Sequence, residues 1–240
     1  MAHKGTVIVT GGSQGIGAAV VNAFLKRNYA VVATARKVSQ ASFAPSENLV
    51  LVDGDIGKAA TAKAVTEAAI TRFGSIDHVV ANAGIFIAKP YVDFTEEDFH
   101  SLVSTNLEGF LHVTQLAVKQ MLAQGKGGSV TSITTSLVAH PISSVPASVS
   151  MITKGGLTAA IVNLASEYAK EHIRFNAVAP GIVDTPLHEN NPKDFLKTLS
   201  PMGTISSAEE IAEAVVFLTE ARNITGEVLH VDGGAHVGKW

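Results

Sequence analysis

Apolar runs and helical patterns alternate along the whole chain. Short, apolar and often β-branched runs predict strands. These runs lie at 6–9, 30–33, 48–52, 78–81, 129–133, 174–178 and 228–231. Apolar residues at helical spacing predict helices between them, near 16–24, 58–73, 101–124, 150–170 and 209–218. Strands that are apolar throughout and alternate with helices indicate a parallel sheet covered on both faces.

This alternation predicts an α/β protein with a single-domain Rossmann fold. We expect a doubly wound parallel sheet of about seven strands flanked by helices. The length of 240 residues fits one domain over residues 1–240, because no shift in composition marks a second one. Hydrophobic residues make up 46% of the chain and charged residues 16%, which is ample for a buried core.

Charge and composition exclude several classes of protein. The net charge of −3 gives no basic footprint for nucleic acid or an anionic membrane. The chain has no cysteine, which removes disulfides and thiolate metal sites, and its nine histidines show no metal-ligand spacing. No signal peptide fits the first residues, and no apolar run reaches about 18 residues. We therefore expect a cytoplasmic protein without a membrane span or a metal.

A glycine-rich stretch, TGGSQGIG at residues 10–17, joins the first predicted strand to the first predicted helix. Gly11 allows a tight turn, Gly15 leaves room for a pyrophosphate, and Gly17 lets the helix pack close to the strand. The helix start directs free N–H groups towards the phosphates. We interpret the stretch as a dinucleotide-binding loop rather than a turn without a ligand. Its expected cofactor contacts are Gly11, Ser13, Gln14, Gly15, Ile16 and Gly17.

Polar or glycine-containing segments follow the other predicted strands. Ligands of such sheets bind at the carboxyl ends of the strands, so these segments are expected to share one cleft. The segments are 35–37, 53–55, 82–84, 134–136 and 179–181.

Several of these motifs occur together in one order and spacing. They are residues 10–17, Asp55, NAG at 82–84, Asn106, Lys154, NAVAPGIVDTPL at 176–187 and VDGG at 231–234. Over residues 7–234 the chain resembles the short-chain dehydrogenase/reductase family. The resemblance implies a nicotinamide dinucleotide and hydride transfer with a carbonyl or alcohol substrate. It also implies cofactor contacts from Asp55, Ile56, Asn82, Ala83, Gly84, Lys154, Pro180, Gly181, Val183 and Thr185.

The same resemblance assigns catalytic positions. Asn106 corresponds to the asparagine that holds a water relay, and Lys154 to the lysine of the YxxxK motif. The family's tyrosine gives a proton to the carbonyl oxygen, but its position here holds Ser150. For the family's serine, which steadies that oxygen, Ser136 is our first choice and Thr135 the second. A simpler role for Ser150 is to cap the N-terminus of a helix.

Two functions stay open without the tyrosine. A serine hydroxyl is far less acidic than a phenol, and losing a positioned acid removes about 10² to 10⁴ in rate. The first hypothesis, which we favour because the site is otherwise complete, is an oxidoreductase with another proton source. The second is a catalytically impaired NADP(H)-binding pseudo-enzyme that acts as cofactor sensor or partner subunit. The alternative proton sources are Lys154, a water held by Asn106 and Lys154, His140, Tyr91 and His188.

The turn after the second predicted strand bears on the choice of dinucleotide. An acidic residue there binds the ribose 2′-OH of NAD, whereas an arginine accommodates the 2′-phosphate of NADP. The turn carries Arg36 and Lys37 and no acid. Against this, Gln14 takes a place that is often basic in NADP-dependent members, and the two cations are alternatively ordinary solvated charges. We favour NADP(H) over NAD(H).

The resemblance extends to substrate and assembly. Residues 182–202 lie where the family places its substrate lid, and their apolar side chains either line a site for a hydrophobic carbonyl or alcohol or only dock the lid. The predicted helices near 101–124 and 150–170 resemble those that pair across subunits, which implies a homotetramer or homodimer. The chain ends on Trp240, for which we expect a pocket on a neighbour. The apolar lid residues are Leu187, Phe195, Leu196, Leu199 and Met202.

Overall fold

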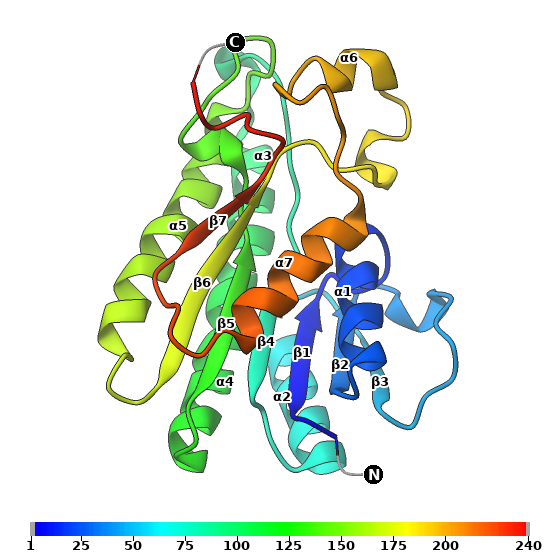
Figure 1. The fold of residues 1–240 in the computed structure, drawn as a ribbon, viewed down its shortest axis with the longest axis vertical. Helices are drawn as coiled ribbons and strands as arrows, with labels where there is room; N and C mark the ends of the chain where they lie inside the picture. The colour runs from blue at the N-terminus through cyan, green and yellow to red at the C-terminus, as the bar shows by residue number, and fades with distance from the viewer. Residues whose placement is uncertain (1–2, 239–240) are drawn as a thin grey trace.

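A parallel sheet of seven strands forms the centre of the computed structural model, which describes residues 3–238 (Figure 1). The strand order is β3-β2-β1-β4-β5-β6-β7. The chain returns to the middle of the sheet between β3 and β4, so β1 and β4 flank the point where the order reverses. Rossmann folds bind ligands at this point. The strands are β1 (Thr6–Thr10), β2 (Ala30–Ala35), β3 (Leu49–Asp53), β4 (His78–Ala81), β5 (Gly128–Ile133), β6 (Ile173–Pro180) and β7 (Val228–Val231).

Helices cover both faces of the sheet. Helices α1 and α7 pack against each other on the near face in Figure 1, and α2, α4 and α5 cover the opposite face. The described helices are α1 (Gly15–Lys26), α2 (Ala59–Phe73), α3 (Glu96–Leu102), α4 (Gly109–Gln124), α5 (Ser148–Glu167), α6 (Lys193–Lys197) and α7 (Ala208–Glu220). The predicted Rossmann fold is confirmed.

Each strand contributes to two hydrophobic cores. On β1, Val7 and Val9 lie in the core under α1 and α7, whereas Ile8 lies in the core under α2, α4 and α5. All three side chains are fully buried. Successive strand residues point to opposite faces, so burial of both faces requires the continuous apolar runs seen in the sequence.

The third helical region differs from its predicted bounds. Helix α3 begins at Glu96 rather than near residue 101, because Thr95 and Asp98 form a capping box that satisfies the first N–H groups. A π-helical segment, Val103–Glu108, then joins α3 to α4. The sequence TEED at 95–98 contains the residues of this capping box, so the start of α3 could be predicted. No sequence pattern near residues 103–108 predicts the π-helical turn.

Two further expectations concern the chain ends and the membrane. In the described part of the chain, no helix combines the length and the apolar character needed to cross a bilayer. Trp240, which we expected to occupy a pocket on a neighbour, lies outside the described residues.

Candidate active site

The glycine-rich loop forms a tight cradle between β1 and α1. Gly11 has a φ of +66°, and a Cβ on Gly17 would lie 2.1 Å from the Gly11 carbonyl oxygen, so only glycine allows this close packing. No side chain caps α1, and within residues 3–238 the N–H groups of Gly15, Ile16 and Gly17 have no partner. A helix start with free N–H groups and no acidic side chain in its first turn suits a phosphate.

Asn82 holds this loop in place from the end of β4. Its side-chain amide donates to the carbonyl oxygens of Thr10 (2.9 Å) and Gly11 (3.1 Å). The backbone N–H of Ala83 donates to Thr10 Oγ1 at 3.0 Å. The NAG motif therefore binds the adjacent strand end directly, and its expected contact with a cofactor stays a prediction.

The end of β2 carries two exposed cations, and the end of β3 carries a carboxylate that is hydrogen-bonded to Ser39. Arg36 and Lys37 follow β2 and are exposed. The neighbouring carboxylate of Asp53 accepts from the N–H of Ser39 (2.8 Å) and from its hydroxyl (2.5 Å), which lowers the pKa of Asp53. Asp55 is also exposed, and its Oδ1 accepts from the N–H of Gly57 at 3.0 Å. The cations at this turn are therefore open to a ligand.

Asn106 and Lys154 meet beside Gly84. Asn106 is buried in the π-helical segment, where its Oδ1 accepts from the N–H of Ile85 (2.8 Å) and its Nδ2 donates to Thr153 Oγ1 (2.9 Å). A Cβ on Gly84 would lie 3.2 Å from Asn106 Oδ1 and 3.0 Å from Lys154 Nζ. The structure therefore brings these two predicted residues together. A π-helical turn is frequent at functional sites.

Burial controls the electrostatics of Lys154. Its side chain is 8% exposed and donates from Nζ to the carbonyl oxygen of Ile133 at 2.8 Å. No carboxylate within residues 3–238 forms an ion pair with it. Burial without a counter-charge disfavours the ammonium form and lowers the pKa of Lys154 to about 8.

The hydroxyl of Ser150 makes two hydrogen bonds to a neighbouring backbone. Ser150 is completely buried, donates to the Ile87 carbonyl oxygen at 2.8 Å and accepts from the Ile87 N–H at 3.0 Å. The predicted N-cap role is wrong, because the N-cap of α5 is Ala147 and Ser150 lies inside the first turn. Ser150 instead joins α5 to the segment that follows β4.

The segment after β5 separates the two serine candidates. Thr135 Oγ1 accepts from the N–H of Leu137 at 3.3 Å and caps the short 3₁₀ helix Ser136–Val138. Ser136 is 4% exposed, and its hydroxyl has no hydrogen-bond partner in the described chain. Ser136 therefore has the freer hydroxyl of the two, and its catalytic role stays a prediction.

The structure reveals a histidine cluster that the sequence did not suggest. The rings of His230 and His236 stack with centroids 4.0 Å apart, and the ring of His140 meets His236 edge-on at 5.9 Å. His236 Nδ1 lies 3.0 Å from the buried carboxylate of Asp232, and burial lowers the pKa of His230. Within residues 3–238 no group of His, Cys, Asp and Glu is arranged to hold a metal ion.

The other proposed proton donors are exposed or half-buried. Tyr91 is 71% exposed. His188 lies in a 3₁₀ turn after Thr185, and its ring contacts the side-chain oxygen of exposed Asn191 at 3.3 Å. His140 contacts His236, as described above. These side chains are not part of the group formed by Asn106 and Lys154.

The segment after β6 crosses the glycine-rich loop. Thr185 lies against Gly15, where a Cβ would be 3.2 Å from Thr185 Cγ2, and Val183 pairs with Ser206 in an isolated parallel bridge. Gly181 packs against Asp232, since a Cβ there would be 2.9 Å from the Asp232 Cα. Two apolar residues dock the segment and three stay largely exposed: Leu196 and Leu199 are buried, and Leu187, Phe195 and Met202 are exposed.

These features define a Rossmann-type α/β protein with a dinucleotide cradle and a buried lysine–asparagine centre at one edge of the sheet. A family model described as "Enoyl-(Acyl carrier protein) reductase" matches residues 11–236. The chain belongs to the short-chain dehydrogenase/reductase family.

Individual relatives agree with this assignment. The chain is 35% identical over 228 residues to carbonyl reductase family member 4 of Xenopus laevis, covering 94% of this chain and 95% of that protein. It resembles a 3-ketoacyl-(acyl-carrier-protein) reductase of Brucella melitensis, solved with NADH, at a TM-score of 0.91 and 27% identity over 98% of this chain and 100% of the other. ElxO with NADP bound gives a TM-score of 0.90 at 26% identity with the same coverage.

Proposed function

We propose that this protein is an NADP(H)-dependent oxidoreductase of a carbonyl or alcohol substrate in which Lys154 is the proton donor. The observation that carries this proposal is the buried Lys154 Nζ beside Asn106, with a pKa of about 8. The serine at the family's tyrosine position cannot take this role, because Ile87 occupies its hydroxyl as donor and as acceptor. This chain is then an atypical member that lacks the YxxxK tyrosine.

The cradle before α1 fits a dinucleotide. The unpaired N–H groups of Gly15, Ile16 and Gly17 can bind the pyrophosphate, and Arg36 and Lys37 can bind a 2′-phosphate. A bound nicotinamide dinucleotide supplies the hydride chemistry. The similar structures carry NADH or NADP, so the preference for NADP(H) depends on the two exposed cations and the missing acid.

Lys154 supplies the proton at the same edge of the sheet as the glycine-rich loop. Below a pH of about 8 its ammonium holds a proton at Nζ that can pass to the carbonyl oxygen, and a base with a pKa near the working pH regains it readily from water. The free hydroxyl of Ser136 can donate a hydrogen bond to the same oxygen. Asn106 fixes the backbone of Ile85 next to Gly84, and its part in a water relay beside Lys154 stays a prediction.

The exposed side of the lid suggests the substrate class. Leu187, Phe195 and Met202 are apolar and at least 49% exposed on the segment that follows β6. A lid of this kind, closing over the site, favours a small or medium hydrophobic carbonyl compound. Leu196 and Leu199 hold the segment to the body of the protein.

The competing function is a cofactor-binding pseudo-enzyme, which the closed Ser150–Ile87 contact also favours. The assay that separates the enzyme from the pseudo-enzyme is oxidation of NADPH and NADH with a broad panel of carbonyl compounds. It compares the native chain with Lys154→Met and Ser150→Tyr. Native turnover that Lys154→Met abolishes supports the proposal. Turnover confined to Ser150→Tyr, or tight NADPH binding without any turnover, supports the pseudo-enzyme. A circular-dichroism spectrum of each variant shows that it is folded.

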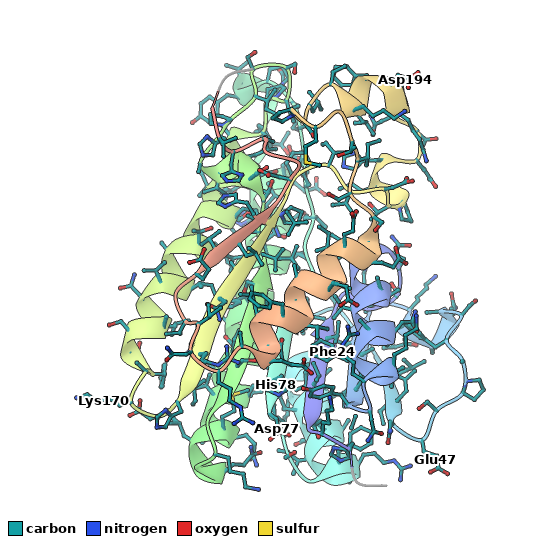
Figure 2. The ribbon with its side chains drawn as sticks, viewed as in Figure 1. Phe24, Glu47, Asp77, His78, Lys170 and Asp194 are labelled. Carbon is teal, nitrogen blue, oxygen red and sulfur yellow. The ribbon has the colours of Figure 1, made fainter. Side chains whose placement is uncertain are left out.

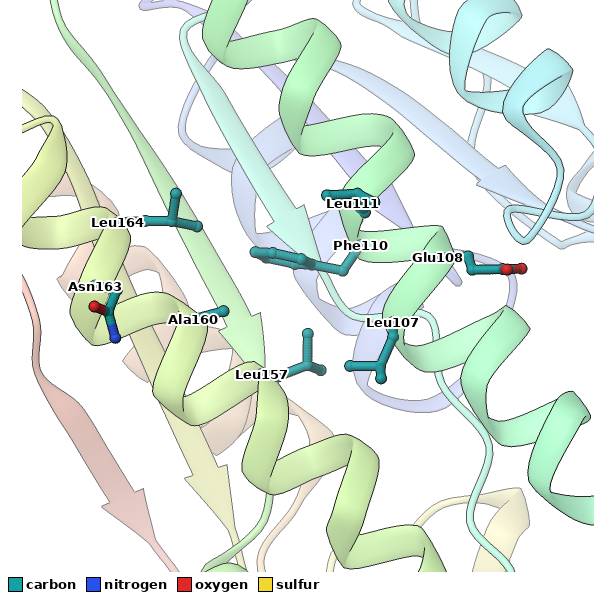
Figure 3. Close-up of a pocket in the computed structure, with 8 residues that line it drawn as sticks. All are labelled: Leu107, Glu108, Phe110, Leu111, Leu157, Ala160, Asn163 and Leu164. Carbon is teal, nitrogen blue, oxygen red and sulfur yellow. The ribbon is translucent and has the colours of Figure 1, made fainter.

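An apolar groove between α4 and α5 suits a second copy of the chain (Figure 3). Its volume is about 460 Å³. Leu157 and Leu164 of α5 face Leu111 of α4 and Leu107 of the preceding π-helical segment across it. We infer that this face pairs across subunits in a homodimer or homotetramer, as the resemblance of these helices implies, and that the protein works in the cytoplasm. Light scattering of the purified chain measures the assembly directly.

A further inference from the structure

A polar cavity lies at the amino ends of the strands, opposite the edge that carries the glycine-rich loop. Its volume is about 1030 Å³, and it lies between the first residues of β4, β5 and β6 and the end of α7. Figure 2 shows Asp77 and His78 at this lower end of the sheet, whereas Asp194 of α6 lies at the opposite end. The cavity is therefore separate from the candidate active site.

The acidic side chains of the cavity already have partners. Asp77 Oδ2 accepts from the N–H of Thr6 and from the hydroxyl of Ser75, both at 2.7 Å. Glu220 accepts from the Tyr29 hydroxyl at 3.1 Å and lies 3.8 Å from Lys4 Nζ. These contacts occupy carboxylate oxygens, and the two negative charges still count in the charge balance of the lining.

Three cations of the cavity have no acidic partner. The guanidinium of Arg174 donates to the carbonyl oxygens of Leu218 (2.7 Å) and Thr219 (2.6 Å) at the end of α7 and to that of Ile224 (3.0 Å). These oxygens carry only partial negative charge. Lys126 and Arg222 are exposed and form no ion pair within residues 3–238. The lining therefore has four Lys and Arg side chains against two carboxylates, an excess of two positive charges in a chain of net charge −3.

His78 adds a neutral hydrogen-bonding group to the floor of the cavity. Its Nδ1 contacts Ser129 Oγ at 2.9 Å, and its ring meets the Tyr29 ring edge-on at 5.8 Å. Burial lowers the pKa of His78 to about 4, so the ring is neutral at physiological pH. The other ring nitrogen has no hydrogen-bond partner in the described chain, and the residue lines the cavity.

We propose that this cavity is a second ligand site that binds a small phosphate-bearing anion. After its three carbonyl contacts Arg174 keeps N–H donors on Nε and Nη2, and a fork of this kind matches phosphate oxygens. Lys126 and Arg222 reach the same anion from the rim, and His78 contacts it from the floor. Burial lowers the pKa of the Arg174 guanidinium, and a bound anion relieves this cost of burying a charge.

The test is calorimetric titration of inorganic phosphate into the full chain, with and without saturating NADPH, at ionic strength held constant with chloride. The variants are Lys126→Gln and Arg222→Gln. Lys63→Gln is the matched control, because Lys63 is an exposed helical lysine on α2. Each rim variant is expected to weaken phosphate binding about tenfold, as the loss of one charge-assisted contact implies, and the control leaves it unchanged.

Two outcomes overturn the proposal. The first is phosphate binding that NADPH abolishes, because the ion then occupies the glycine-rich loop. The second is absent binding, or binding that the rim variants leave unchanged. The variants are also titrated without NADPH, so a failure of the proposed function leaves this test intact. NMR gives a further readout on the intact chain. The ring signals of His78 are assigned as those that disappear in His78→Gln. Phosphate is expected to shift these signals and to leave those of His230 unchanged.

Discussion

Replacing Ser150 with alanine separates a structural role of this residue from a catalytic one. The hydroxyl is fully buried and makes two hydrogen bonds to Ile87, as donor at 2.8 Å and as acceptor at 3.0 Å. A net contribution of about 1 kcal/mol for each bond gives a loss of about 2 kcal/mol in the free energy of unfolding. For a domain of this size that loss corresponds to a Tm lower by about 4–8 °C.

The assay has two readouts, thermal unfolding by calorimetry and NADPH oxidation per folded molecule. We expect Ser150→Ala to lose stability but to keep the native kcat within a few-fold, because Lys154 and Asn106 are untouched. Ser148→Ala is the matched control, since Ser148 lies in the same turn of α5 but is exposed. An unchanged Tm together with a large loss of kcat would refute the reasoning and make the Ser150 hydroxyl the proton donor.

Other predictions concern charge, pH and assembly. Activity is expected to fall as the pH rises through about 8, where Lys154 loses its proton, and a flat pH profile of kcat/KM contradicts the assignment. Because the pKa of Lys154 lies below its ordinary 10.5, the unfolded state binds more protons between these values, so the free energy of unfolding rises with pH from about 8 to 10.5 in urea titrations. Lys154→Met is expected to lose that rise. Arg36→Asp is expected to raise the Kd of NADPH about tenfold or more and that of NADH far less, and equal losses refute a 2′-phosphate site. Leu111→Glu is expected to lower the mass seen by light scattering, whereas Ile70→Glu, at an exposed apolar position on α2, leaves it unchanged.

The sheet, its helices and the glycine-rich loop could be predicted because their signals are local. Apolar runs give the strands, and glycines at fixed offsets give the close contact between Gly17 and Gly11. Lys154 and Asn106 were assigned through the resemblance to the short-chain dehydrogenase/reductase family, on the motifs that match it. The last strand, β7, was predicted from the same alternation, and the structure places it beside β6.

The partners of Ser150 and the histidine cluster could not be predicted, because they join distant parts of the chain. Ser150 and Ile87 are 63 residues apart, and their hydrogen bonds depend on how α5 packs on the segment after β4. His140 and His236 meet only because the turn after β7 reaches the loop after β5. A histidine in an isolated segment carries no periodic signal that points to such a neighbour.

The π-helical segment Val103–Glu108 has a consequence for how the site tolerates sequence change. A π turn holds one residue more than an α turn. The extra residue rotates the preceding helix, α3, by about 100° relative to α4. Deleting a residue between Asn106 and α4 would restore a regular helix and turn Asn106 away from Ile85, while the buried face of α4 stays in register. The direction of this side chain thus depends on the local helix type as well as on its hydrogen bonds to Ile85 and Thr153.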